Sequence, residues 1–215
     1  MTHSLGGRAA QKLHTRQSLL DAVLRLTADH SLGSLSLREV SRQAGIVPAG
    51  FYRHFPDLES LGVALVEQSL GGLRTALRAV RAGLTSSEEI ARRSVDALLR
   101  EVRAHREQFR FIARERYGGL GRVRRAIGDQ LRLISEELAV DLLTGERAAA
   151  PVLSRWSDED VKMLTDLIVN HMISTAAAIV DVPPGRSAAE RRVVATATRQ
   201  LQLVIIGARH WLDPA

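Results

Sequence analysis

The chain has 215 residues, a formal net charge of +6, a hydrophobic share of 45% and a charged share of 25%, which are the proportions of an ordinary soluble globular protein. It contains no cysteine, which excludes disulfides, thiolate catalysis and zinc–thiolate sites. We expect a cytoplasmic protein without a membrane partner, because the first residues lack the apolar segment of a signal peptide and no apolar run is long enough to span a bilayer.

Helical periodicity runs through the whole chain, and no stretch alternates as a half-buried strand does. In SLLDAVLRLTADH, for example, Leu20, Val23 and Leu24 fall on one helix face. The clearest breaks are at 32–34, 56–57, 84–87, 117–121, 146–157 and 182–187. The pattern predicts helices over 10–30, 36–43, 48–54, 57–82, 87–105, 107–116, 121–144, 158–181 and 188–212.

Polar residues mark several of these helix starts. The spacing S-x-x-E is typical of a capping box, in which the serine hydroxyl and the glutamate carboxylate each accept a backbone N–H. An aspartate or serine directly before a helix is also a favoured N-cap. The predicted boxes are Ser36/Glu39, Ser86/Glu89 and Ser187/Glu190, and the further N-caps are Asp57 and Ser157.

Positive charge is concentrated near the N-terminus. Residues 1–56 contain seven Lys and Arg against three Asp and Glu, so about a quarter of the chain carries a charge of +4. A positive field on one part of a protein suits a polyanionic partner such as nucleic acid. The alternative is a generally arginine-rich composition with solvated side chains.

The segment GIVPAGFYRHFPD at 45–57 combines turn residues with a cluster of rings in a chain that is only 4% aromatic. Gly45 can take the left-handed conformation that ends a helix, and Pro48 suits the first turn of the next one. Phe51 and Phe55 are four residues apart and face inward on the second helix. Tyr52 and its cationic neighbours then lie on the outer face.

Two short helices joined by a tight turn, with an aromatic inner face and a cationic outer face, are typical of a helix-turn-helix. The second helix is about 10 Å long at 1.5 Å per residue, which fits a major groove about 12 Å wide. The alternative is an ordinary helical hairpin in an all-α protein. Together with the basic N-terminal quarter, the pattern favours DNA binding.

The segment SLSLREVSRQAGIVPAGFYRHFPDLESLGVALV at 34–66 resembles the DNA-binding region of the TetR family of transcriptional regulators. The resemblance implies an all-α fold of about nine helices, with a DNA-binding domain over 1–56 and a ligand-binding and dimerisation domain over 57–215. The sequence departs from the family at Val47, where many members have a capping Ser or Thr, and at Leu58, where many have a lysine near a phosphate.

A narrower resemblance concerns the effector. REVSRQAGIVPAGFYRHFPDLESLG, with FRFIARERYGG at 109–119, is similar to the FabR- and DesT-type repressors of unsaturated fatty acid synthesis. Those proteins respond to long-chain acyl thioesters, so the resemblance implies a repressor that senses acyl-CoA. The alternative is a regulator of another small apolar ligand, controlling efflux or catabolic genes.

The outer face of the helix-turn-helix supplies the expected DNA contacts. Tyr52 and His54 resemble the family's phosphate-contacting pair, which fixes register without reading bases. Arg53 either contacts phosphate or pairs with Asp57. The small Ala49 and Gly50 let the helix approach base edges. The full expected set is Arg16, Ser36, Arg38, Pro48, Ala49, Gly50, Tyr52, Arg53 and His54.

The segments VKMLTDLIVNHMISTAAAIV at 161–180 and RRVVATATRQLQLVIIGARHWL at 191–212 mix small and large apolar residues. Small residues allow helices to approach closely, and two such helices from each of two chains would form a four-helix interface. A homodimer would also let two short recognition helices read a palindromic operator. The alternative is that both helices lie in a monomer core.

The helices between 57 and 181 are expected to enclose the effector. Asn170, His171 and Ser174 interrupt an apolar face as candidate polar groups, and arginines around YGGLG at 117–121 suit the phosphates of coenzyme A. Each apolar candidate has the alternative of being plain core, and each arginine that of a solvated face. The full expected set is Val66, Leu70, Leu73, Leu98, Phe109, Ile112, Arg114, Leu131, Ile134, Asn170, His171 and Ser174.

No catalytic motif occurs in the sequence. P-loop, H-E-x-x-H and G-x-S-x-G patterns are absent, and the seven histidines form no i, i+4 pair for a metal. We therefore expect neither an enzyme nor a bound cofactor or metal. A helical enzyme and an interaction module without DNA binding are the remaining alternatives.

Overall fold

The computed structural model describes residues 3–81, 87–144 and 156–211, and within these ranges it contains nine α-helices, one 3-10 turn and no strand. The all-α prediction is confirmed, and the largest difference in helix bounds is at the first helix, which begins at His3 instead of residue 10. The elements are α1 (His3–Leu26), η1 (Leu32–Ser34), α2 (Leu37–Gln43), α3 (Pro48–Phe51), α4 (Leu58–Arg81), α5 (Ser87–Ala104), α6 (Arg106–Gly118), α7 (Gly121–Thr144), α8 (Asp158–Asp181) and α9 (Ser187–Arg209).

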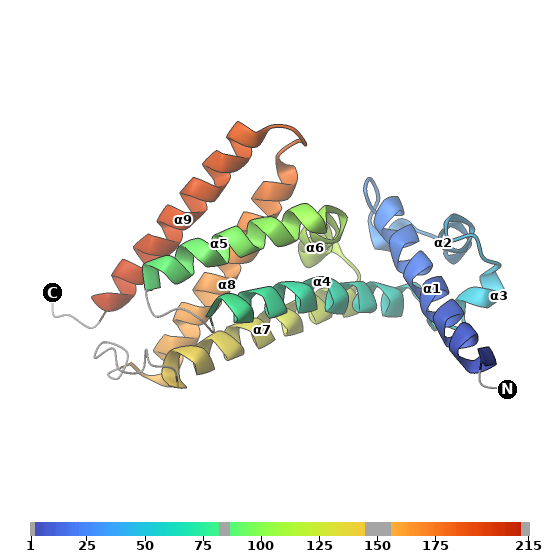
Figure 1. The fold of residues 1–215 in the computed structure, drawn as a ribbon, viewed down its shortest axis with the longest axis horizontal. Helices are drawn as coiled ribbons and strands as arrows, with labels where there is room; N and C mark the ends of the chain where they lie inside the picture. The colour runs from blue at the N-terminus through green and yellow to red at the C-terminus, as the bar shows by residue number, and fades with distance from the viewer. Residues whose placement is uncertain (1–2, 82–86, 145–155, 212–215) are drawn as a thin grey trace.

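The molecule is elongated, with α1, η1, α2 and α3 at one end and α4–α9 forming the rest (Figure 1). We call the first group the head and α4–α9 the bundle. Helix α4 starts beneath the head and runs the length of the bundle beside α7. The head also packs on the bundle through contacts of α1 with α4 and α6. The domain boundary after residue 56 stays a prediction.

Three of the predicted helix starts have the expected capping geometry. The Ser36 hydroxyl accepts from the backbone N–H of Glu39 at 3.2 Å, and the hydrogen bonds that Ser36 returns to the Glu39 carboxylate lower the pKa of Glu39. Ser157 caps α8 and forms a full box with Asp160. Asp57 caps α4 by accepting a backbone N–H at 2.6 Å. These polar side chains fix where α2, α4 and α8 begin.

The predicted box at the start of α9 is wrong. Ser187 is already the first helical residue, so the N-cap is Arg186, whose side chain makes no capping bond. Glu190 instead forms an ion pair with Arg103, which ties α9 to α5. The predicted box at Ser86 lies outside the described residues, as do most of the predicted breaks at 84–87 and 146–157.

Helix α8 is long and apolar enough by composition to cross a membrane, but half of that segment is buried inside the protein. It packs against α5, α6, α7 and α9. A core helix and a spanning helix share this composition, and the packing of α8 is that of a core helix.

The head and the bundle meet at a close crossing of α4. A Cβ at Gly62 would lie 2.5 Å from Cδ2 of Leu32 in η1 and 2.8 Å from Cγ2 of Val123 in α7. Because such distances are too short for carbon atoms, the glycine lets the three elements approach. The buried Glu115 of α6 adds a polar tie, since its Oε1 accepts the backbone N–H of Leu32 at 3.0 Å.

Candidate nucleic-acid interface and ligand cavity

The turn between α2 and α3 has the chemistry that the sequence predicts. Gly45 has a φ of 71°, a left-handed conformation that favours glycine. The backbone N–H of Ile46 donates to the carbonyl of Ser41 at 3.0 Å, which closes the turn. Val47 stands at the N-cap of α3 without a side-chain capping bond, and Pro48 occupies the first turn. The helix-turn-helix prediction is confirmed in its geometry.

An aromatic cluster supports α3 from the inside. Phe51 and Phe55 are buried, with ring centroids 6.0 Å apart, whereas Tyr52 is 62% exposed. The Arg16 guanidinium lies 4.3 Å from the Phe55 ring centroid and donates to the carbonyl of His54 at 3.5 Å. Arg16 therefore holds α1 against the residues that follow α3. It is also a candidate phosphate contact.

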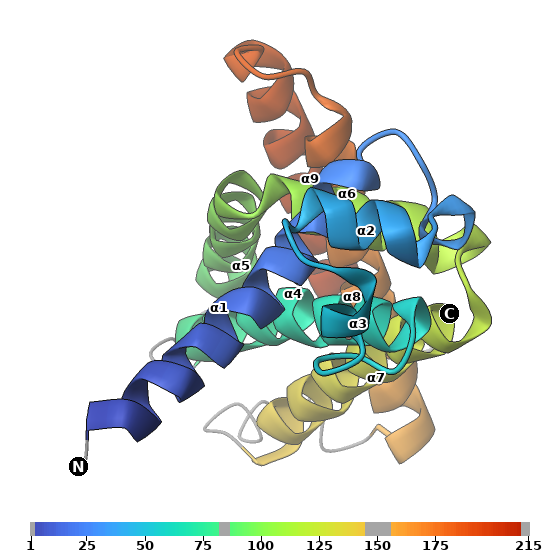
Figure 2. The same cartoon turned by 90° about the vertical axis from the view of Figure 1, so that its right-hand side faces the viewer.

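The outer face of α3 is open to solvent and lies toward the viewer with α2 in Figure 2. Arg53 is exposed, and Asp57 pairs with Arg122 at 3.1 Å instead of with Arg53. A Cβ at Gly50 would make an ordinary contact of 3.7 Å with Ile46, so packing does not require a glycine there. Of the other candidates, Ser36, Arg38, Pro48 and Ala49 are also exposed.

His54 is partly buried at the edge of this face. Burial lowers the pKa of His54 below its ordinary value of 6.5, and the nearby charges of Lys12, Arg16 and Arg53 act in the same direction. The imidazole is therefore neutral at pH 7 and can donate one hydrogen bond.

The affinity for DNA is expected to rise as the pH falls from 8 toward 6. A phosphate beside His54 would raise its pKa, so the complex would bind more protons than the free protein over this range, and protonation would favour the complex. His54→Gln should flatten the profile, and the exposed His30→Gln should leave it unchanged. Fluorescence anisotropy of labelled operator DNA at fixed salt measures the pH dependence of affinity for both variants. A pH dependence in His54→Gln equal to that of the wild type would contradict a phosphate contact.

Replacing Tyr52 with phenylalanine is expected to weaken binding to every DNA sequence alike, by about fivefold, because one hydrogen bond to phosphate contributes about 1 kcal/mol. The edge-to-face contact between the rings of Phe51 and Tyr52, 5.9 Å apart, does not need the hydroxyl, so the head should keep its stability. Binding titrations on an operator and its single-base variants test this. Loss confined to one base pair would mean that Tyr52 reads sequence.

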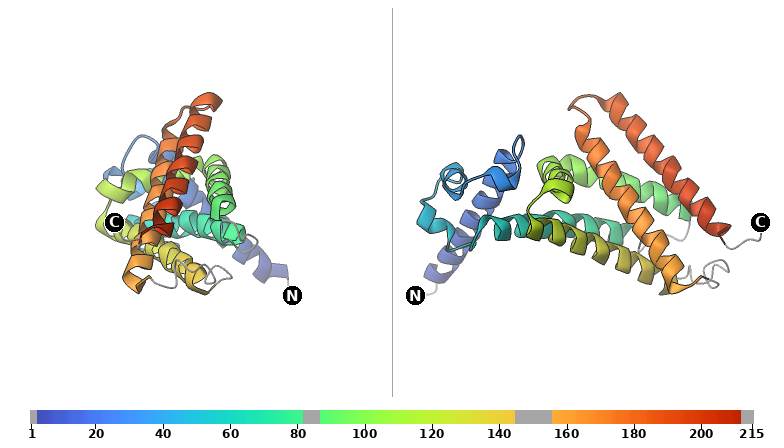
Figure 3. Two further views of the ribbon diagram at one scale, coloured as in Figure 1. Left: turned by 90° about the vertical axis from the view of Figure 1, so that its left-hand side faces the viewer. Right: turned by 180° about the vertical axis from the view of Figure 1, so that it is seen from behind.

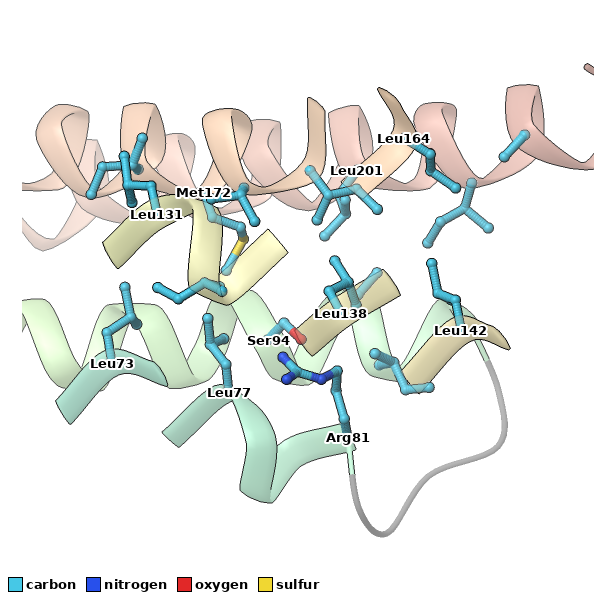
Figure 4. Close-up of a pocket in the computed structure, with 18 of the residues that line it drawn as sticks. Leu73, Leu77, Arg81, Ser94, Leu131, Leu138, Leu142, Leu164, Met172 and Leu201 are labelled. Carbon is cyan, nitrogen blue, oxygen red and sulfur yellow. The ribbon is translucent and has the colours of Figure 1, made fainter. Parts of the chain in front are cut away.

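The bundle contains a cavity of about 430 Å³ between α4, α5, α7, α8 and α9 (Figure 4). That volume is in the range of small-molecule sites. On α7 its wall runs from Leu131 to Leu142, about 16 Å at the helical rise. The wall is mostly aliphatic, made by Leu73, Leu77, Ile90, Ala91, Leu131, Ile134, Leu138, Leu142, Leu164, Ile168, Val169, Met172, Ile173, Leu201, Ile205 and Ala208, with Arg81, Ser94, Arg209 and His210 as its polar members.

One buried guanidinium reaches this cavity and pairs with a partly exposed carboxylate. The Arg81 guanidinium lies beside Ser94 in the cavity wall (Figure 4) and donates to Asp141 at 2.5 Å. The Arg81 side chain is only 7% exposed, and its pairing with a carboxylate leaves no net charge. The cavity thus offers a long apolar surface with the polar groups of Arg81 and Ser94 side by side in its wall.

The cavity includes only part of the expected ligand set. Leu73, Leu131 and Ile134 line it. The other apolar candidates lie outside it and are fully packed in the core, near α6 and the head-side half of α4, where rings and branched side chains fill the space; they are Val66, Leu70, Leu98, Phe109 and Ile112.

Arg114 points away from the cavity, contrary to expectation. Its guanidinium donates to the backbone carbonyls of Thr27, Ala28 and His30 at 2.8–2.9 Å. These carbonyls follow the end of α1 and have no helical partners, so Arg114 satisfies them. This contact could not be predicted from sequence, because the partners are more than 80 positions away.

The expected polar group on α8 also lies outside the cavity. Val169, Met172 and Ile173 face inward, so Asn170, His171 and Ser174 fall on the other side of the helix. Asn170 accepts from Arg116 at 2.6 Å, His171 contacts the carbonyl of Ala197 at 3.0 Å, and Ser174 is exposed.

Comparison with known proteins identifies both parts of the chain. Residues 19–65 match the family model of bacterial regulatory proteins of the tetR family, and residues 87–207 match the tetracyclin repressor-like C-terminal domain.

Several solved structures of transcriptional regulators have a similar fold. The regulator FadR of Bacillus subtilis in complex with stearoyl-CoA has a TM-score of 0.67 at 16% identity, covering 89% of this chain and 98% of that one. The fatty acid degradation regulator FadR of Bacillus halodurans has a TM-score of 0.64 at 15% identity, with coverages of 94% and 97%. The ketosteroid regulator KstR2 of Mycobacterium tuberculosis has a TM-score of 0.59 at 18% identity, with coverages of 89% and 93%.

Proposed function

The chain belongs to the TetR family and is a ligand-responsive transcriptional regulator, and from that premise we propose that it is a repressor that senses long-chain acyl thioesters. The observation that carries this proposal is the long, almost wholly aliphatic cavity, which is joined to the head by the continuous helix α4. An extended acyl chain could lie along an aliphatic wall of this length. The regulated genes would be those of fatty acid synthesis or desaturation.

We propose that the residues on the outer face of α3 hold the DNA backbone and that the effector acts by shifting the population of head positions. Helix α4 is the lever, since it both lines the cavity and begins beneath the head. Arg114 and Glu115 of α6 form a second connection, because both bond to backbone groups of the head. The effect of a ligand on DNA affinity cannot exceed its differential affinity for the two states.

The protein is proposed to work as a homodimer in the cytoplasm. Helices α8 and α9 lie together on the side of the molecule seen in the left panel of Figure 3. Large apolar side chains are exposed on both, at Met163 and Leu167 of α8 and at Leu203 and Ile206 of α9. Burying them against a second copy would place two heads on one palindromic operator. Sedimentation at micromolar concentration, with Leu203→Glu as the variant that should dissociate, tests this.

The proposal is tested by two binding experiments on the full chain. A gel shift with DNA from upstream of its own gene, competed with nonspecific DNA at stated salt, should show a specific complex. Calorimetric titration with palmitoyl-CoA and oleoyl-CoA should show saturable heat. Specific DNA binding without any acyl-CoA binding would leave a TetR regulator of another apolar ligand, and a ketosteroid is then the first compound to test, given the likeness to KstR2.

A further inference from the structure

A second hollow adjoins the cavity on the outside of the bundle, where α6, α7 and α8 converge. Its volume is about 400 Å³, and Leu131 and Val169 line both the hollow and the cavity. We call this hollow the basic recess, because four of its lining residues are cationic and one is acidic. Its residues are Arg116, Tyr117, Arg124, Ile127, Gly128, Leu131, Arg132, Lys162, Asp166, Val169 and Asn170.

We infer that the basic recess binds the phosphate-bearing head of an amphipathic ligand whose apolar chain lies in the cavity. The inference rests on the proposed function, since it needs an apolar chain behind Leu131 and Val169. It adds a second chemical requirement on the effector, namely anionic phosphate at the polar end, and it identifies the residues that would meet it.

The charges of the recess are only partly neutralised by protein carboxylates. Lys162 pairs with Asp166 at 2.5 Å, and Arg132 pairs with Asp129. Burial alone would raise the pKa of Asp166, but hydrogen bonds from Lys162 and Ser135 bring it below its ordinary value, so this pair is ionised and neutral overall.

Two guanidinium groups in the recess have uncharged hydrogen-bond partners. Arg116 donates to the side-chain oxygen of Asn170 at 2.6 Å, and Arg124 donates to the backbone carbonyl of Gly119 at 3.3 Å. A guanidinium has five N–H donors, so these bonds leave others for further oxygens. Arginine binds phosphate with two parallel hydrogen bonds, which suits a phosphate between α6 and α7.

The recess also has room for a head group. No atom lies within 4 Å of the position that a Cβ would take at Gly128, so this exposed helical glycine borders open space. Leu131 and Val169 line both this space and the apolar cavity, so the two hollows adjoin at these side chains. A ligand spanning the two sites would pass its polar junction between these side chains.

Calorimetry on the full chain with three ligands that share one acyl chain tests the inference. Oleoyl-CoA and oleoyl lysophosphatidate carry phosphate, whereas oleate carries a carboxylate alone. At least one phosphate ligand should bind about tenfold or more tightly than oleate, and its affinity should fall with added salt. The ligand that gains affinity identifies the source of the phosphate. Equal affinities for all three ligands would contradict phosphate binding in the basic recess, while acyl-chain binding in the cavity would still hold.

Matched variants locate the effect. Arg124→Gln should remove most of the phosphate preference and leave oleate binding unchanged, and Gly128→Trp should do the same by filling the recess. Arg125→Gln is the control, since Arg125 is an exposed neighbour on α7 outside the recess. A phosphate preference that survives in both Arg124→Gln and Gly128→Trp would place the head group elsewhere. If none of the three ligands binds to the wild-type chain, the acyl proposal itself fails.

Discussion

Replacing Ala49 with glutamate is expected to weaken operator binding by about 100-fold or more, because it places a carboxylate on the outer face of α3 against DNA phosphates. Unfavourable like-charge contacts at an interface cost several kcal/mol, and 100-fold corresponds to about 2.7 kcal/mol. Ala49 is exposed and takes no part in the buried aromatic cluster, so the head should remain folded. Fluorescence anisotropy gives the affinity, and circular dichroism melting gives the stability.

The matched control is Thr75→Glu, which adds the same charge at an exposed position on α4 far from the head. It should change operator affinity by less than about twofold at 0.15 M salt, since distant exposed charges are screened. Equal losses in the two variants would mean that only the total charge matters. Wild-type affinity in Ala49→Glu would remove α3 from the DNA interface.

Filling the cavity is expected to abolish effector binding without loss of DNA binding. Leu138 lies partway along the cavity wall (Figure 4), so Leu138→Trp should exclude several methylene groups of an acyl chain. Each buried methylene contributes about 0.8 kcal/mol, so an acyl chain that can no longer bury four of its methylene groups should bind about 100-fold or more weakly. Calorimetry with oleoyl-CoA measures the loss, and operator titration should show wild-type affinity in the absence of ligand.

Leu133→Trp is the control for this substitution, because Leu133 is on the same helix but is 40% exposed and outside the cavity wall. It should bind oleoyl-CoA as the wild type does. Undiminished binding in Leu138→Trp would show that the ligand occupies another site, and loss in both variants would point to general disturbance of α7.

The helix-turn-helix could be predicted from sequence because its determinants are local. Gly45 ends one helix, Pro48 starts the next, and the spacing of Phe51 and Phe55 fixes which face is buried. None of these depends on residues far away in the chain. The same locality explains why the caps at Ser36 and Ser157 were predicted correctly.

The cavity could be predicted only in part, because apolar periodicity does not distinguish a packed stripe from one that borders a void. Leu70 and Leu73 lie three residues apart on the inner face of α4, yet only Leu73 reaches the cavity. The difference depends on how side chains from five helices fill the space between them. The wall on α9, including Leu201 and Ile205, was missed for this reason, although its i, i+4 spacing is visible in the sequence.

Charged residues show the same limit. The arginines between 110 and 125 belong to one basic segment of the sequence, but they have different partners. Arg114 bonds to the head, and Arg122 pairs with Asp57. Arg116 and Arg124 line the basic recess. Their partners come from distant elements, so the sequence predicts a basic region but not which side chain faces which site.

The most direct test of coupling between the cavity and the head is operator affinity measured at increasing oleoyl-CoA, with ligand saturation followed by calorimetry under the same conditions. We expect saturation to change operator affinity by at least about fivefold, the lower end of usual coupling free energies, and Leu138→Trp to lose this response. Saturation of the cavity with no change in operator affinity would contradict this coupling.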